Sequence, residues 1–186
     1  MLQQLLKNFS GLRKKPKRMT QGNTFRSNIV SRNMEHPEHA NEAFPRDALE
    51  RIAHRIAAVE QSTGAEIRVS IRDLRDAGEA DLSMRELAQK EFAALGLHHH
   101  KDRHGILLLV LYHERKFYVY GDEGVHSKIH PEAWEDVART LNKHFAAGAY
   151  EAGLTEAIQR IEHHLKGKLP KHAALVHNVS DEVAVR

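Results

Sequence analysis

The segment 121–124, with the sequence Gly-Asp-Glu-Gly, places two carboxylates next to each other between glycines. Carboxylate oxygens are the ligands that hard cations such as Ca²⁺ and Mg²⁺ take from proteins. Asp122 and Glu123 are therefore candidate metal ligands. Glu66 and Asp102 are two further carboxylates that could reach the same end of a sheet. Together the four residues predict a divalent-cation site for Ca²⁺ or Mg²⁺, with no organic cofactor.

A structural interpretation of the same segment is also open. In that interpretation Gly121 and Gly124 adopt positive φ angles in a turn between a strand and a helix, and Asp122 caps the backbone. The spacing of the carboxylates does not match the alternating ligands of an EF-hand loop. The motif alone therefore leaves a metal site and a structural turn as alternatives.

Three arginines could gather around an anion, because the guanidinium fork suits phosphate. Arg68 and Arg103 are the candidate phosphate-binding residues, and Arg115 is the third arginine of the group. The alternative is an ion-pair network with the neighbouring acids Glu66, Asp102 and Glu114. The chain has no cysteine, no Gly-x-Ser-x-Gly elbow and no P-loop, so a phosphatase would use a metal-activated water or an aspartate nucleophile. Asp122 is the candidate nucleophile.

Histidines are abundant, with 15 in the chain, and several occur in clusters. The run 98–100 with His104, and the pair His163 and His164, could supply imidazoles to zinc, nickel or copper. Consecutive residues cannot all point in one direction on a regular element, and no His-Glu-x-x-His motif is present. The alternative is that these histidines are solvated surface residues.

Hydrophobic periodicity predicts the elements that carry these side chains. Apolar residues recur at helical spacing in four segments, and they alternate or run continuously in three others. The predicted helices are 47–61, 82–95, 131–145 and 150–166, and the predicted strands are 65–72, 106–111 and 116–120. This order of elements predicts an α/β fold, an α/β/α sandwich with a short mixed β-sheet flanked by helices.

The first two predicted strands have different patterns. Strand 106–111 is apolar throughout, as expected for a central strand that is covered on both faces. Strand 65–72 alternates, so that Ile67, Val69 and Ile71 share one face and charged residues share the other. We therefore expect the charged face of this strand to reach solvent or a site.

The domain boundaries follow from the distribution of charge. Residues 1–34 contain eight Lys and Arg and no acid, whereas the rest of the chain holds 20 basic and 25 acidic residues. We predict a disordered basic tail at 1–43, a folded domain at 44–167 and a loose tail at 168–186. No apolar run approaches the roughly 20 residues that span a bilayer, and a cytoplasmic location is the simplest expectation.

The basic tail has several interpretations. Clustered Lys and Arg in residues 1–32 could bind nucleic acid or anionic lipid by neutralising phosphates. The composition also fits a solvated tail or an organellar transit peptide. Translation that starts at Met19 or Met34 would remove part of the tail, and a start at Met34 would remove all eight of its Lys and Arg residues.

Four short segments together resemble the TPM domain family, which is named for a thylakoid-lumen repair protein of photosystem II, its cyanobacterial relative and a nematode receptor modulator. They are 65–69 (Ala-Glu-Ile-Arg-Val), 103–105 (Arg-His-Gly), 114–116 (Glu-Arg-Lys) and 121–124. The resemblance covers roughly residues 44–167, and the chain is similar to the stand-alone branch of the family, which lacks a membrane anchor. It implies the α/β sandwich fold, divalent-cation binding, especially of calcium, and an acid phosphatase activity proposed for the plant member.

These observations together predict a TPM-type domain that binds a divalent cation in an accessory role toward another protein. A weak metal-dependent acid phosphatase that uses the same carboxylates is the first alternative. An adaptor that binds nucleic acid or an anionic membrane through the basic tail is the second.

Overall fold

A computed structural model of the chain describes residues 23–24, 39–99, 102–169 and 183–185. The strands are β1 (Asn23–Thr24), β2 (Glu66–Arg72), β3 (Gly105–Leu111), β4 (Lys116–Gly121) and β5 (Ala184–Val185). The helices are α2 (Ala40–Ala43), α3 (Arg46–Thr63), α4 (Met84–Ala94), η1 (Leu97–His99), α5 (Glu123–His126), α6 (Pro131–Ala146) and α7 (Tyr150–Leu165). Most of the predicted tails lie outside the described residues, and of the predicted nucleic-acid or lipid surface at 1–32 only β1 is described.

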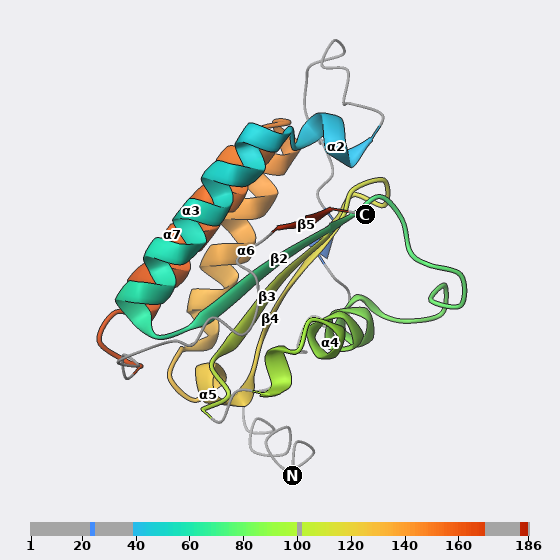
Figure 1. Ribbon diagram of the computed structural model, residues 1–186. Coiled ribbons are helices and arrows are strands. Elements are labelled where there is room, and N and C mark those ends of the chain that lie inside the picture. Colours follow the sequence, from blue (N-terminus) through green and yellow to red (C-terminus); the bar gives the residue numbers. More distant parts are fainter. Residues whose placement is uncertain (1–22, 25–38, 100–101, 170–182, 186) are drawn as a thin grey trace, which may run out of the picture.

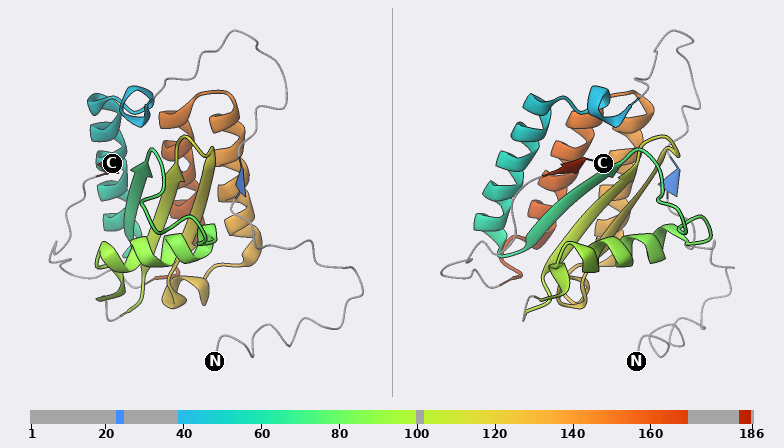
Figure 2. Two further views of the ribbon diagram at one scale, coloured as in Figure 1. Left: turned by 90° about the vertical axis from the view of Figure 1, so that its right-hand side faces the viewer. Right: turned by 45° about the vertical axis from the view of Figure 1, so that its right-hand side comes forward.

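The described elements form three layers around one mixed sheet with the strand order β1-β4-β3-β2-β5. Helices α3, α6 and α7 lie on one side of the sheet and α4 lies on the other (Figure 1). Figure 2 shows the same separation from two further directions. The predicted α/β sandwich with a mixed sheet is confirmed, and α2 adds a helical turn before the predicted domain start at residue 44.

The pairing of the three long strands decides which residues share an end of the sheet. β2 and β3 are parallel, with Glu66 opposite Gly105 and Arg72 opposite Leu111. β3 and β4 are antiparallel, with Ile106 opposite Gly121. The carboxyl ends of β2 and β3 therefore lie together at one edge, and the end of β4 lies beside the start of β3 at the opposite edge.

Strand β3 is the centre of the core, as its apolar sequence predicts. All seven of its residues are buried. Ile106, Leu108 and Val110 belong to the larger hydrophobic cluster under α3, α6 and α7, and Leu107 and Leu109 belong to the cluster under α4. A strand with both faces covered needs apolar residues at every position, which is why the continuous run identified it.

Strand β2 differs from the expectation that its charged face would reach solvent or a site, because all seven of its residues are buried. Arg72 forms ion pairs with Glu79 at 2.5 Å and with Glu91 at 3.6 Å. Ser70 donates a hydrogen bond to Glu91 at 2.7 Å. Buried charges are tolerated when they are paired, and the acids that pair with Arg72 come from α4 and the loop before it.

Helix α4 begins at a capping box formed by Ser83 and Glu86. The Ser83 side chain accepts a hydrogen bond from the Glu86 backbone N–H, and the Glu86 side chain accepts one from the Ser83 backbone. This reciprocal pair satisfies donors that the first helical turn leaves without partners. It fixes the position at which the chain turns from the β2–α4 loop into α4.

Candidate metal centre

Asp122, the predicted ligand and candidate nucleophile, is a buried N-cap with both carboxylate oxygens engaged. Arg103 donates from Nε to Asp122 Oδ2 at 2.6 Å and from Nη2 to Oδ1 at 2.7 Å. The Glu123 backbone N–H donates to Oδ1 at 2.8 Å, which begins α5. The hydrogen bond to Asp122 and the charge attraction raise the pKa of Arg103 above its usual value. The capping role expected in the structural interpretation is confirmed.

The other three predicted carboxylate ligands lie near the same sheet edge but point to different partners or to solvent. The Glu66 N–H donates to His104 O at 3.1 Å, while the Glu66 side chain accepts from Arg68 at 3.2 Å. Asp102 and Glu123 are exposed. Within the described ranges, no three of the four predicted ligands bring their oxygens within 4.8 Å of one another. Calcium or magnesium binding here stays a prediction.

The two candidate phosphate-binding arginines are both engaged in ion pairs. Arg68 is 4% exposed and pairs with Glu60 at 3.5 Å and with Glu66 at 3.2 Å. Arg103 is half exposed and pairs with Asp122. These contacts agree with the ion-pair alternative, and phosphate binding by the two residues stays a prediction.

Gly121 and Gly124 are required by close packing, and the expectation that they adopt positive φ angles is wrong. A Cβ on Gly121 would lie 2.8 Å from the Trp134 ring. A Cβ on Gly124 would lie 2.7 Å from the Arg103 carbonyl oxygen and would also overlap the carbonyl of Asp102. The two glycines therefore let β4 and α5 approach α6 and the chain that enters β3.

His39, Asp73 and His113 form a group that the sequence did not predict. One ligand atom from each lies within 4.8 Å of the others, and no other such group occurs in the described part of the chain. His39 Nδ1 lies 3.8 Å from Asp73 Oδ2, and His113 Nε2 lies 3.8 Å from Asp73 Oδ1. The three side chains are partly exposed, at 58%, 38% and 40% of their surface.

The parallel pairing of β2 and β3 brings Asp73 and His113 together. Asp73 directly follows β2, and His113 follows β3 after one residue. The Tyr112 N–H donates to Arg72 O at 2.8 Å, and the His113 N–H donates to Asp73 O at 3.0 Å, so backbone hydrogen bonds still join the two segments beyond the strand ends. The carboxyl ends of parallel strands are where open α/β sheets most often bind ligands.

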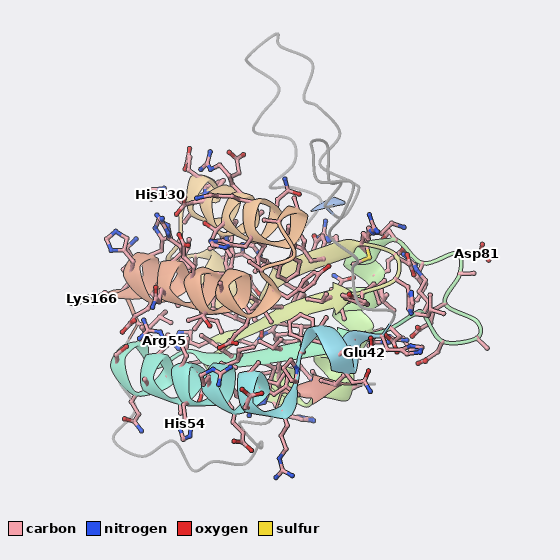
Figure 3. All side chains as sticks on the ribbon, turned by 90° about the horizontal axis from the view of Figure 1, so that it is seen from above. Glu42, His54, Arg55, Asp81, His130 and Lys166 are labelled. Carbon is pink, nitrogen blue, oxygen red and sulfur yellow. The ribbon has the colours of Figure 1, made fainter. Side chains whose placement is uncertain are left out.

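Helix α2 brings the third member to the same edge. His39 is the N-cap of α2, and the next residue, Ala40, donates its N–H to Asp73 Oδ1 at 2.8 Å. In Figure 3 the α2 residue Glu42 lies on the same side of the molecule as Asp81, and Lys166 and His130 lie toward the opposite end. Asp73 therefore anchors the start of α2 and faces both imidazoles.

Two imidazole nitrogens and one carboxylate form a donor set that suits zinc and similar transition metals. Tetrahedral zinc with bonds of about 2.0–2.1 Å places its ligand atoms about 3.3 Å apart. The two 3.8 Å distances run to different oxygens of Asp73, and one ligand atom from each residue lies within 4.8 Å of the others, so side-chain rotations would have to bring the three atoms closer together around an ion. Three protein ligands leave a fourth position for water or another molecule.

The histidines that the sequence singled out are not part of this group. His98 and His99 are exposed in η1 with ring centroids 3.8 Å apart, and His104 is buried. His164 lies 3.2 Å from Asp136 Oδ2, so that it joins α7 to α6. The residue at position 100 lies outside the described residues. The signal that could have found the group is position, because Asp73 and His113 follow adjacent parallel strands.

Comparisons with known proteins agree with this fold. A family model for the TPM domain matches residues 40–164. The chain is similar to the BA42 protein from the psychrophilic bacterium Bizionia argentinensis, with a TM-score of 0.66 and 20% identity over 75% of this chain and 93% of that one. It is also similar to the N-terminal domain of a protein from P. gingivalis, with a TM-score of 0.52 and 21% identity over 73% and 85%. A search of curated proteins finds no match.

A further similar structure is the N-terminal domain of cg2496 protein from Corynebacterium glutamicum. Its TM-score is 0.53 at 10% identity, over 80% of this chain and 97% of that one. At such low identities these likenesses show a common fold. None of the helices in the described ranges is both long enough and apolar enough to cross a membrane. The cytoplasmic location stays a prediction.

Proposed function

Since this chain belongs to the TPM domain family, we propose that it is a divalent-cation-binding accessory domain and that His39, Asp73 and His113 are its cation ligands. One observation carries the proposal: three potential ligand atoms from three separate segments lie within 4.8 Å of one another. They converge at the carboxyl end of the only parallel pair among the three long strands.

The donor set favours a transition metal over calcium. Zn²⁺ binds imidazole nitrogen and carboxylate oxygen with four ligands, whereas Ca²⁺ takes six to eight oxygens. An ion held by His39, Asp73 and His113 would keep a position for an outside ligand. Because the three side chains are partly exposed, a group on another protein could reach that position. This accessibility supports an accessory role toward a protein partner.

Calorimetry on the full chain without an affinity tag tests the proposal. We expect one saturable zinc site, and we expect His113→Ala and Asp73→Ala each to weaken binding by at least about tenfold, or about 1.4 kcal/mol. The exposed residue His54 points away from the body of the molecule and provides the matched control (Figure 3). Zinc affinity that is the same in His113→Ala as in the unchanged chain would contradict the proposal.

Calcium binding by Asp122, Glu123, Glu66 and Asp102 remains a second candidate, supported by the family resemblance. Titration of calcium and magnesium under the same conditions tests it, with Glu123→Ala as the variant that leaves the Arg103 pair intact. Saturable heat that Glu123→Ala removes would support this site.

The phosphatase alternative rests on the family resemblance alone. As a nucleophile, Asp122 would have to release at least one oxygen from Arg103 before it could attack phosphorus. Metal-dependent turnover of a phosphomonoester that Asp122→Asn abolishes would support this alternative. The adaptor alternative through residues 1–32 predicts binding that falls steeply with salt and disappears when these residues are deleted.

A further inference from the structure

Helix α2 is a single turn that is attached to the rest of the domain at both of its ends. Its start is held by the hydrogen bond from the Ala40 N–H to Asp73 Oδ1 at 2.8 Å. Its end is held by Phe44, which is buried and lies against Tyr150 with ring centroids 5.6 Å apart. A helix of one turn does not persist by its own backbone hydrogen bonds. Its position therefore depends on these attachments.

The three candidate ligands divide unequally between α2 and the sheet. The backbones of Asp73 and His113 are joined directly, because the His113 N–H donates to Asp73 O at 3.0 Å just beyond the ends of β2 and β3. His39 belongs to the α2 segment, and its side chain makes no capping hydrogen bond to the helix. An ion that binds all three would join the α2 segment to a rigid pair on the sheet.

We propose that this centre is a metal-dependent latch, in which the bound ion fastens the segment 39–44 to the carboxyl edge of β2 and β3. The inference rests on the proposed function and adds regulation to it. Release of α2 separates His39 from Asp73 and His113, so the ion binds the docked form more tightly than the released form. The metal supply then controls the fraction of molecules in which the segment 39–44 is docked on the sheet.

The size of the effect follows from linkage. A ligand that binds only the docked form lowers the population of the released form by the factor 1 + [L]/Kd, which is about 100 at a free ion concentration 100 times Kd. Amide protons that exchange through release of α2 should slow by the same factor. The relevant amides are those of Ala40, Glu42, Ala43 and Phe44, which donate hydrogen bonds within or next to α2.

Hydrogen exchange on the full chain, followed with zinc, without metal and after addition of EDTA, measures this effect. We expect zinc to slow exchange of the α2 amides by up to about 100-fold under the saturating conditions above and EDTA to reverse the change. Amides in the middle of α7 provide an internal reference, because α7 holds no member of the centre.

Two variants separate the ion from the other attachments of α2. His39→Ala removes a ligand without removing a cap, so the zinc effect on the α2 amides should disappear while metal-free exchange stays the same. Asp73→Asn keeps an oxygen that can accept from the Ala40 N–H but removes the charge that attracts the ion. It should also abolish the zinc effect. His54→Ala, on the exposed face of α3, should leave the effect unchanged.

The outcomes distinguish the latch from the proposed function. If calorimetry detects no zinc binding, both are overturned. If zinc binds and His113→Ala weakens the binding, but the α2 amides exchange at the same rate with and without zinc, the latch alone is overturned. Slower exchange that His39→Ala removes supports both.

Discussion

Arg103 and Asp122 form a two-point salt bridge that joins the chain entering β3 to the end of β4. The two nitrogen–oxygen distances are 2.6 and 2.7 Å, and Arg103 adopts a positive φ angle of 57°. Planar, two-point pairing of this kind is the strongest hydrogen-bonding geometry that arginine offers a carboxylate. The carboxylate that the sequence marks as a metal ligand is thus already neutralised by a cation of the protein.

Removing that competing cation tests the calcium prediction. If calcium binds Asp122, it must displace the guanidinium, so Arg103→Met should strengthen calcium binding several-fold. Calorimetric titration of calcium measures the change, and Arg139→Met on the exposed side of α6 is a suitable control. Calcium affinity that is unchanged or lower in Arg103→Met would remove Asp122 from the list of ligands.

Gly124→Ala should destabilise the domain by about 1–3 kcal/mol through overpacking. The added Cβ would lie 2.7 Å from the Arg103 carbonyl oxygen, and backbone atoms cannot rotate away as a side chain can. Urea denaturation measures the loss. Gly78→Ala is the matched control, since a Cβ there meets no atom within 4 Å and the only cost comes from the positive φ angle of 87°. Equal losses in the two variants would contradict the packing explanation.

Glu91→Gln should cost about 1–3 kcal/mol of unfolding free energy, because it removes one counter-charge from the buried Arg72. Glutamine keeps an oxygen that accepts from the Ser70 hydroxyl, so the change isolates the charge. Arg72 retains Glu79, which limits the loss. The exposed substitution Glu135→Gln on α6 should stay within about 0.5 kcal/mol of the unchanged protein. If Glu91→Gln lowers the free energy of unfolding by no more than about 0.5 kcal/mol, the ion pair between Glu91 and Arg72 adds no net stability.

Glu79 should make the domain sensitive to acid. Burial raises the pKa of its carboxyl, but hydrogen bonds from Arg72 and Lys90 outweigh burial and lower the pKa to about 2. A carboxyl whose pKa is lower in the folded state stabilises the fold above its ordinary value of 4.5, and this stability is lost as the pH falls toward 2.

Melting temperatures from pH 6 to pH 2 measure this contribution. Glu79→Gln should melt at a lower temperature than the unchanged protein at pH 6, and the difference should shrink as the pH falls from 4.5 toward 2. Glu135→Gln serves again as the exposed control. A difference that stays constant over the whole range would show that the Glu79 charge makes no contribution.

The sequence predicted the sandwich because its elements have strong local patterns. β3 is a continuous apolar run, and α4 begins at a capping box that the structure contains. The charged face of β2 was assigned wrongly, since alternation in the sequence is the same whether the polar face meets water or buried acids. Only the packing of α4 and of the loop before it against the sheet shows that Arg72 meets Glu79 and Glu91.

The candidate centre could not be predicted from local patterns. His39 precedes a helix of one turn with no periodicity, and Asp73 and His113 meet only because β2 and β3 are parallel and in register. The sequence directed attention to clustered histidines, although neighbours in sequence point in different directions. Ligands that come from three separate segments require the strand order to be known.

The most direct test of the cation centre is a nitrogen–proton correlation spectrum of the histidine rings, recorded on the full chain before and after one equivalent of zinc. The chain has 15 histidines, and single His→Ala variants assign the signals. We predict that the ring signals of His39 and His113 change together at one equivalent while those of His98, His163 and His164 stay in place. Changes in the clustered histidines, with those of His39 and His113 unaffected, would contradict the account.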